Sequence, residues 1–227
     1  GPGGHPPARA SRWSPMRLIA VNVVMLVLQM TSKDLQRQLV LWAPGVAGGE
    51  YFRLLTSAFM HYGAMHLLFN MWALYVIGPP LEAWLGRLRF GALYGLSALG
   101  GSVLVYLLAP PIGAATAGAS GAVFGLFGAT FVVAKRLNLD VRWVVLLIAI
   151  NLVLTFTVPS ISWQGGHVGG LITGGALIAA VYTYAPPRER RNLVQGGVSA
   201  AVLVVFAALI YWRSAELIAQ YGALITG

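Results

Sequence analysis

Two long stretches without any charged residue constrain this chain more than any other feature. Phe90 to Ala134 and Trp143 to Pro187 each run for 45 residues without Asp, Glu, Lys or Arg. A helix that spans a bilayer needs about 20 apolar residues, so each stretch has the length for two crossings. Pro110 to Gly113 divides the first stretch and Pro159 to Gly166 divides the second, because proline and glycine interrupt helices. The pattern predicts two helical hairpins, which are helices three to six of a membrane protein.

Three more apolar segments predict the remaining crossings. Helix two ends at Gly78-Pro79-Pro80 in this prediction, because proline cannot continue the hydrogen-bond ladder. The mixed polar and aromatic segment Lys33 to Phe59 is predicted to be a loop embedded at the membrane interface. With 58% hydrophobic and 9% charged residues, the composition favours an all-α, polytopic transmembrane helical bundle of seven helices. The three segments are Leu18 to Ser32, His61 to Ile77 and Gly197 to Trp212.

The basic residues predict the sidedness of the bundle. With seven crossings, 11 of the 15 Lys and Arg residues fall on the side of the N-terminus and 4 on the other. We therefore expect the N-terminus in the cytoplasm and the C-terminus outside. The net charge of +9 lies in short clusters between apolar runs, which fits membrane topology better than nucleic-acid binding. A signal peptide is the alternative for residues 18–32, although the charge asymmetry argues against it.

The chain divides into three regions in this interpretation. Residues 1–15 are expected to be a flexible N-terminal segment, for which a remnant of an expression vector is a further reading. Residues 16–185 form the six-helix core, and residues 186–227 comprise a basic cytoplasmic turn and the seventh helix. Cysteine is absent, which excludes disulfides, thiolate chemistry and cysteine metal ligands.

Polar side chains of three helices fall at one depth in the membrane. Ser120, His167 and His66 each lie fifteen to seventeen residues from the cytoplasmic end of their helix, about 22 to 26 Å at 1.5 Å per residue. The hydrocarbon core is about 30 Å thick, so these groups share a layer near the outer face. Ionisable groups at membrane depth are costly and usually functional.

This layer holds the groups needed for acyl transfer. His167 can take the proton of Ser120, which makes the hydroxyl a nucleophile. His66 and Asn70 are one turn apart, so both can donate N–H groups to a developing oxyanion, with the Ser120 backbone N–H as a third donor. No Asp or Glu lies in helices four to six, so the sequence predicts a dyad rather than a triad.

Other readings of these residues remain open. Histidine and asparagine also hold membrane helices together by hydrogen bonds. Three histidines at one depth could bind zinc, yet no acidic residue joins them, and we expect neither a metal nor another cofactor. Seven helices with polar groups would also suit a small-molecule transporter, but the polar layer lies away from the midplane.

Several motifs, taken together, resemble those of the rhomboid family of intramembrane serine proteases, of the bacterial type with a six-helix core and one C-terminal helix. The resemblance covers the chain from Arg53 to Ala185. Phe52 stands where the family's loop motif usually has tryptophan, and Phe124 where it often has tyrosine. The motifs are Phe52-Arg53-x-x-Thr56-x-x-Phe59-x-His61, His61-x-x-x-x-His66-x-x-x-Asn70, Gly78-x-x-x-Glu82, Gly118-Ala119-Ser120-Gly121 and His167-x-x-Gly170-x-x-x-Gly174.

The resemblance implies a role for each of these residues. It makes Ser120 the nucleophile and His167 the general base, with His66, Asn70 and the Ser120 backbone binding the oxyanion. Phe124 would stack on the His167 ring. Structural support is implied for His61, Arg53, Glu82, Gly118, Gly121, Gly170 and Gly174, of which Gly170 and Gly174 would let helix six approach helix four.

The implied reaction is the hydrolysis of a peptide bond in or near the transmembrane helix of a substrate protein. The implied partners are transmembrane substrates and membrane lipid, without nucleic acid, and the oligomeric state stays open. The alternative is a non-catalytic scaffold of the same fold that binds or dislocates membrane proteins. Short loops and the lack of an organelle-targeting segment suggest a bacterial inner membrane. Helix five and its loop, Trp143 to Trp163, are expected to move aside for the substrate.

Overall fold

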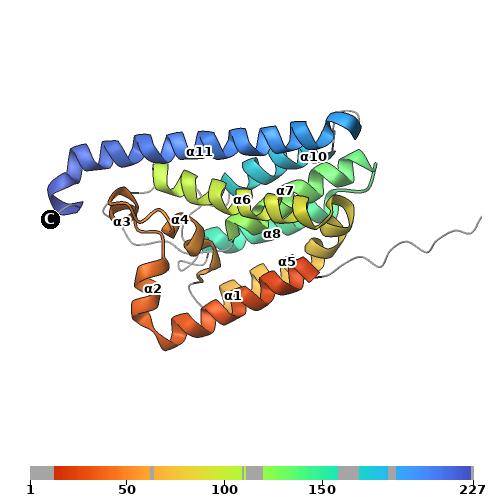
Figure 1. Ribbon diagram of the computed structural model, residues 1–227. Helices are drawn as coiled ribbons and strands as arrows, with labels where there is room; N and C mark the ends of the chain where they lie inside the picture. The colour runs from red at the N-terminus through yellow and green to blue at the C-terminus, as the bar shows by residue number, and fades with distance from the viewer. Residues whose placement is uncertain are drawn as a thin grey trace, which may run out of the picture.

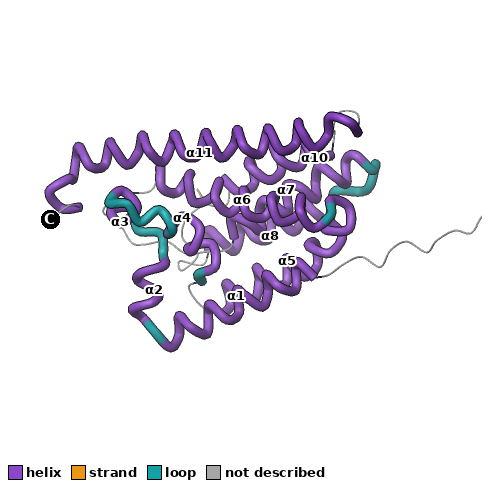
Figure 2. The backbone as a smooth tube through the Cα atoms, in the orientation of Figure 1, coloured by secondary structure: helices purple, strands orange, loops and turns teal. Residues whose placement is uncertain are grey.

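The computed structural model shows a bundle of helices. It describes residues 13–61, 64–108, 110, 120–157, 169–183 and 188–225, and none of these residues forms a β-strand. Figure 1 shows that the long helices run roughly side by side, and Figure 2 shows how short the described loops between them are. Residues 1–12, Gly118, His167 and most of the loops at 110–116 and 159–164, for which the sequence made predictions, lie outside the described residues. The architecture confirms the prediction of an all-α polytopic membrane bundle.

The helices have the following bounds. The long helices are α1 (Trp13–Thr31), α5 (Ala64–Leu85), α6 (Arg87–Leu108), α7 (Ser120–Arg136), α8 (Arg142–Thr157) and α11 (Arg188–Ile225). The sixth predicted helix is described over 169–183, where it contains the π-helical segment η2 (Ile172–Ala179) and α10 (Ala180–Thr183). Between α1 and α5 lie α2 (Lys33–Leu39), α3 (Ala43–Ala47), α4 (Arg53–Thr56) and the 3₁₀ turn η1 (Ser57–Phe59). The predicted interfacial loop is therefore a chain of short helices.

Four of these helices are long and apolar enough to cross a membrane by length and composition. They are α1, α5, α6 and α11, while α8 and the helix over 169–183 contain shorter apolar stretches. The chain is thus an integral membrane protein, and the number of seven crossings stays a prediction.

The prediction that helix two ends at Gly78-Pro79-Pro80 is wrong. Both prolines lie inside α5, which continues to Leu85. Membrane helices tolerate proline because neighbouring helices compensate for the lost hydrogen bonds. Here α1 packs directly on this turn, since a Cβ added at Gly78 would lie 2.9 Å from Cγ of Pro15. The helix instead ends at Gly86, whose φ of 84° is a conformation that favours glycine.

The prediction of a seventh helix over residues 197–212 is too short. The helix α11 begins at Arg188 and ends at Ile225, with a kink at Tyr221. The sequence prediction stopped at Trp212, before Arg213, but a charged residue ends only the lipid-facing part and does not break a helix.

The helices are arranged with α1 and α11 on opposite sides of the bundle. Figure 1 shows α1 beside α5 and α11 beside α6, with α7 in the interior. The main core cluster joins α5, α6 and α7 and includes Phe90, Leu93 and Leu126, all of which are fully buried. The helices α1 and α11 expose much of their apolar surface, as expected for helices that face lipid.

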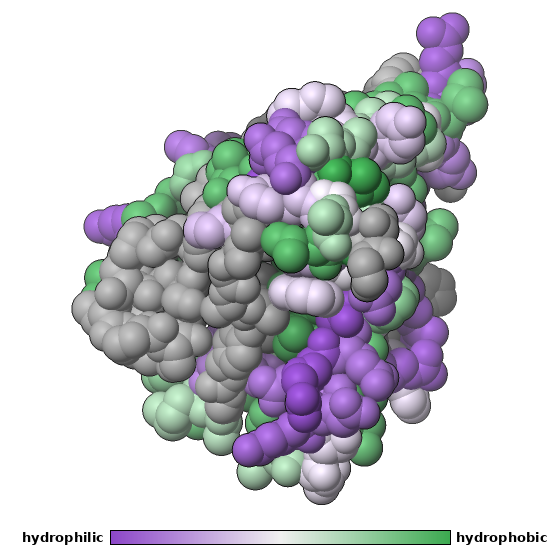
Figure 3. All heavy atoms as spheres, turned by 90° about the vertical axis from the view of Figure 1, so that its left-hand side faces the viewer, coloured by the Kyte–Doolittle hydropathy of each residue, from purple (hydrophilic) through white to green (hydrophobic). Residues whose placement is uncertain are grey.

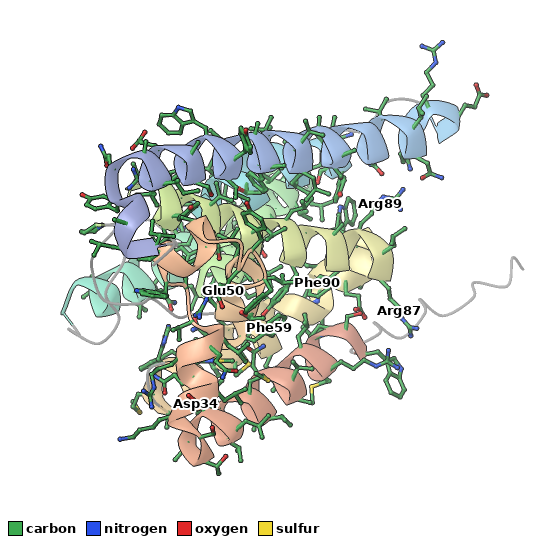
Figure 4. The ribbon with its side chains drawn as sticks, turned by 60° about the vertical axis from the view of Figure 1, so that its left-hand side comes forward. Asp34, Glu50, Phe59, Arg87, Arg89 and Phe90 are labelled. Atoms are coloured by element: carbon green, nitrogen blue, oxygen red, sulfur yellow. The ribbon has the colours of Figure 1, made fainter. Side chains whose placement is uncertain are left out.

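Charged residues lie at the two ends of the bundle. Figure 4 shows Arg87 and Arg89 at one end, and Asp34 and Glu50 near the other. Figure 3 looks onto the end that carries α2 and α3, where hydrophilic side chains gather around α2. This arrangement leaves the long helices between the two ends with a nearly uncharged surface, as a bilayer requires.

The helix α7 and the helix over 169–183 touch through their backbones. A Cβ added at Gly170 would overlap the carbonyl oxygen of Gly121, and one at Gly174 would overlap Cα of Gly125. A Cβ at the next residue, Gly175, would lie 2.7 Å from Cα of Gly128, about one turn after Gly125 in α7. Small residues of this kind let membrane helices approach closely. The contact aligns the first turn of α7 with residue 170.

The alanine variant of Gly174 tests this contact. We expect Gly174→Ala to destabilise the protein by about 1–3 kcal/mol, because overpacking forces the two helices apart. Gly91→Ala is the matched control, since nothing lies within 4 Å of a Cβ at Gly91. Thermal unfolding in detergent compares the two variants, and equal melting temperatures would contradict the close contact.

Candidate functional site

His66 and Asn70 lie one turn apart in α5 and both are buried, with exposed fractions of 7% and 3%. One turn after Asn70, Ala73 packs in a cluster with Val123 of α7. Since Val123 is one turn after Ser120, and α5 and α7 begin at the same end of the bundle, Asn70 and Ser120 lie at the same level. The predicted oxyanion donors and the predicted nucleophile therefore share one end of the bundle.

The backbone of Ser120 begins α7. Its side chain is outside the described part of the structure, and so is the whole of His167. The described neighbours of these residues are in direct contact, because Gly121 follows Ser120 and touches Gly170. Gly170 comes three residues, or about one helical turn, after His167 in the sequence. The site residues thus belong to two chain segments that meet, and the Ser120–His167 pair remains a prediction.

The donor groups of His66 and Asn70 have no hydrogen-bond partner among the described residues. This holds for both ring nitrogens of His66 and for Nδ2 of Asn70. A buried donor without a partner costs about 1–3 kcal/mol, so such groups need an explanation. Two unpaired donors on one helix face are suited to bind an anionic oxygen that forms during a reaction.

His61 is held by a residue that the sequence analysis missed. Gln29 of α1 donates from Nε2 to the His61 carbonyl oxygen (2.8 Å) and accepts from the His61 backbone N–H at Oε1 (2.9 Å). Gln29 is buried. In the sequence it is a polar amide within an otherwise apolar helix, and this is the signal that could have identified it.

The ring of His61 lies edge-on to the ring of His66, with 5.2 Å between the centroids. Burial, and in second place the neighbouring His66, lowers the pKa of His61 to about 3. The His61 ring is therefore neutral near neutral pH and supports the His66 ring as an uncharged neighbour.

Arg53 connects α4 to the preceding short helices. Its Nη1 donates to the carbonyl oxygens of Arg37 (2.7 Å) and Val40 (2.9 Å), and its Nε pairs with Glu50 (3.3 Å). The guanidinium also lies over the ring of Trp42, 5.8 Å from its centroid. A buried charge with this many partners holds the segment before His61 in one conformation.

Glu82 lies inside α5 and is buried, whereas the sequence placed it at the interface after the end of the helix. Its Oε2 accepts a hydrogen bond from the backbone N–H of Ser14 at the start of α1 (3.2 Å). A carboxylate at this position compensates the unpaired N–H groups of the first helical turn.

Phe124 is buried in α7 and packs edge-on against Phe127, with 5.4 Å between the ring centroids. Its predicted partner His167, as well as Gly118, lies outside the described residues. The stacking of Phe124 on His167 therefore stays a prediction.

Gln29→Leu tests the contact between α1 and His61. Loss of the two hydrogen bonds leaves the His61 backbone groups unpaired, so we expect the variant to lose about 1–3 kcal/mol of stability. Hydrogen exchange of the His61 amide should become faster. Met30→Leu is the control because its side chain is 77% exposed. An unchanged exchange rate in Gln29→Leu would contradict the described contact.

Comparison with known proteins gives one matching family model, described as Rhomboid domain, over residues 48–186. A relative is Putative rhomboid protease YdcA of Bacillus subtilis, 36% identical over 152 residues, which cover 65% of this chain and 74% of YdcA. Rhomboid protease GluP of Bacillus subtilis is 38% identical over 141 residues, 60% of this chain. RHOMBOID-like protein 6, mitochondrial, of Arabidopsis thaliana is 33% identical over 170 residues. The chain spans only 27% of the length of GluP and 53% of that of the Arabidopsis protein.

Proposed function

Because this chain belongs to the rhomboid family, we propose that it is an intramembrane serine endopeptidase that uses Ser120 as the nucleophile and His167 as the general base. The observation that carries this proposal is the pair of buried donors on His66 and Asn70, which have no partner among the described residues and lie level with the first turn of α7. Buried donors without a partner are costly, and the oxygen of a tetrahedral intermediate would satisfy both of these.

The reaction follows from these roles. His167 takes the proton of the Ser120 hydroxyl as its oxygen attacks the peptide carbonyl, and the oxyanion receives hydrogen bonds from His66, Asn70 and the Ser120 backbone. The intermediate collapses when the protonated His167 gives its proton to the leaving amine. Water, deprotonated by His167, then hydrolyses the acyl-enzyme and releases Ser120.

The proposed substrates are proteins with a transmembrane helix. A carbonyl in a helix is hydrogen-bonded and shielded, so the segment must unwind before Ser120 can attack, which favours small or helix-weakening residues near the cut. The proposed location is a bacterial inner membrane, with the N-terminus in the cytoplasm and the C-terminus outside. The distribution of Lys and Arg supports this orientation.

Fluorophosphonate labelling tests the nucleophile. We expect the purified protein to react and Ser120→Ala to lose the reaction completely. His66→Ala and Asn70→Ala should each lower the kcat of peptide cleavage by about 10²- to 10³-fold, as the loss of one oxyanion donor does in other hydrolases.

Ser97→Ala is the control for these variants, because Ser97 is a buried serine of α6 without an assigned role. It should react like the unmodified protein. Labelling that persists in Ser120→Ala would contradict the proposed nucleophile. An unmodified protein that neither reacts nor cleaves would favour the non-catalytic scaffold.

The helix α8 is the proposed gate for the substrate. It packs mainly against α7, and Val144 is the buried residue among its described side chains, whereas Trp143, Leu146 and Val153 are each at least 45% exposed. Few packing contacts make a helix easier to displace than its neighbours. This supports sideways access of a transmembrane helix between α8 and α5.

A covalent link between α5 and α8 tests this gate. We expect a crosslink between one cysteine in each helix to abolish cleavage of a transmembrane substrate but to preserve cleavage of a short water-soluble peptide. The chain contains no cysteine of its own, so the link is specific. The reduced double-cysteine protein is the control, and unchanged turnover of the transmembrane substrate would refute lateral access there.

A further inference from the structure

The helix α11 is much longer than a membrane crossing requires. Its 38 residues correspond to about 57 Å at 1.5 Å per residue, whereas the hydrocarbon core is about 30 Å thick. Near its start, Gln195 and Asn192 accept hydrogen bonds from Arg89 at the start of α6. Its last part, residues 213–225, therefore reaches the opposite end of the bundle, as Figure 1 shows. We call residues 213–225 the α11 tip.

The α11 tip is fixed to the end of α6 by polar contacts. The hydroxyl groups of Tyr106 and Ser214 are hydrogen-bonded at 2.7 Å in a buried position. Arg213 donates from Nε to the Tyr106 carbonyl oxygen at 3.2 Å and forms an ion pair with Glu216. Bonds of this kind hold both the position and the rotation of a helix end, which lipid contacts alone do not.

The α11 tip also packs against α3 through an apolar cluster. Leu217 is 1% exposed and is the buried member from α11. A Cβ added at Gly48, directly after α3, would lie 3.5 Å from Cγ2 of Ile225. The cluster consists of Leu41, Val46, Ala47, Leu54, Val105, Tyr106 and Leu217, with Ala43, Leu99, Ile210, Tyr221 and Ile225 around it.

On its other side, α3 rests on the ion pair that organises the segment before His61. A Cβ added at Gly45 would lie 2.6 Å from Oε1 of Glu50 and 2.8 Å from Nε of Arg53. Figure 4 shows Glu50 near this end of the bundle, and its side chain is 44% exposed. Arg53 begins α4, which continues without a break into η1 and then reaches His61 after Met60.

The contacts form a continuous path from α11 to the oxyanion donors. The α11 tip contacts α3, α3 contacts the Glu50–Arg53 pair, and α4 and η1 lead to His61, whose ring lies against His66. The step from α4 to His61 follows the chain itself, and the other steps are contacts between described residues. A displacement of α3 would therefore move the segment that supports His66.

We propose that the α11 tip is a positioning element for the oxyanion donors, with Leu217 as its main positioning residue. The proposal rests on the proposed proteolytic function and adds that the seventh helix, beyond anchoring the chain, keeps His66 in its reactive orientation through α3 and Arg53. Because the oxyanion exists only in the transition state, loss of the tip contact lowers kcat and leaves KM nearly unchanged.

Leu217→Ala tests this proposal. We expect kcat for peptide cleavage to fall about tenfold, because small displacements of catalytic groups have large effects on rate. KM should change less than about twofold. Leu203→Ala is the matched control on the same helix, since Leu203 is 46% exposed, and it should cleave normally. Tyr106→Phe removes only the hydrogen bond to Ser214 and should lower kcat in the same direction by a smaller factor.

A disulfide rescue separates positioning from general instability. In the Leu217→Ala background, Gly48→Cys and Ile225→Cys place two thiols at a described contact in a chain without other cysteines. Oxidation with copper phenanthroline should restore kcat to within about twofold of the unmodified protein, and reduction should lower it again. Gly48→Cys with Leu224→Cys is the control pair, because Leu224 is 77% exposed and should not form the link.

The ring resonances of His61 and His66, observed with ¹³C-labelled histidine, provide a readout that does not need activity. They should shift in Leu217→Ala and return on oxidation of the cysteine pair. If the unmodified protein proves inert to fluorophosphonate, the proposed function fails, and these resonances still decide the positioning proposal. Normal kcat in Leu217→Ala, or resonances that do not change, would overturn it.

Discussion

The contact between α7 and the helix over 169–183 is the constraint on which the rest of the structure depends. Gly121 and Gly125 face Gly170 and Gly174 so closely that a single added carbon would overlap the opposite backbone. In a lipid environment the hydrophobic effect does not drive helices together, so association depends on close packing of this kind. The contact brings the start of α7, directly after Ser120, against Gly170 and leaves α8 and α11 on the outside.

The proposed oxyanion site is held from several sides at once. His66 and Asn70 are part of one helix, α5, but the residues that fix their surroundings come from α1, through Gln29, and from the short helices around Arg53. Groups that must act on a charge only while it forms need this support, because they have no permanent partner to orient them. The donors that lack a partner among the described residues therefore depend on the hydrogen bonds around them for their position.

Much of the fold could be predicted from the sequence, but the end of α5 and the role of Gln29 could not be predicted. The uncharged stretches predicted the membrane helices, and the depth of Ser120, His66 and His167 suggested a shared layer. The proline pair at 79–80 misled the prediction, because the packing of Pro15 against Gly78 in α5 is not visible in a local pattern. Gln29 was missed since its partner is the backbone of His61, 32 residues away. The catalytic pair itself stays a prediction, because His167 and the Ser120 side chain lie outside the described residues.

The sequence by itself determined that this chain is a bundle of membrane helices and which residue types could carry chemistry, because hydrophobic length and the cost of buried polar groups are local properties. Only the tertiary structure decided which backbones touch, which donors lack a partner among the described residues and how far α11 reaches along the bundle. These features depend on contacts between residues that are distant in the chain, such as Tyr106 with Ser214. Local periodicity carries no information about such contacts.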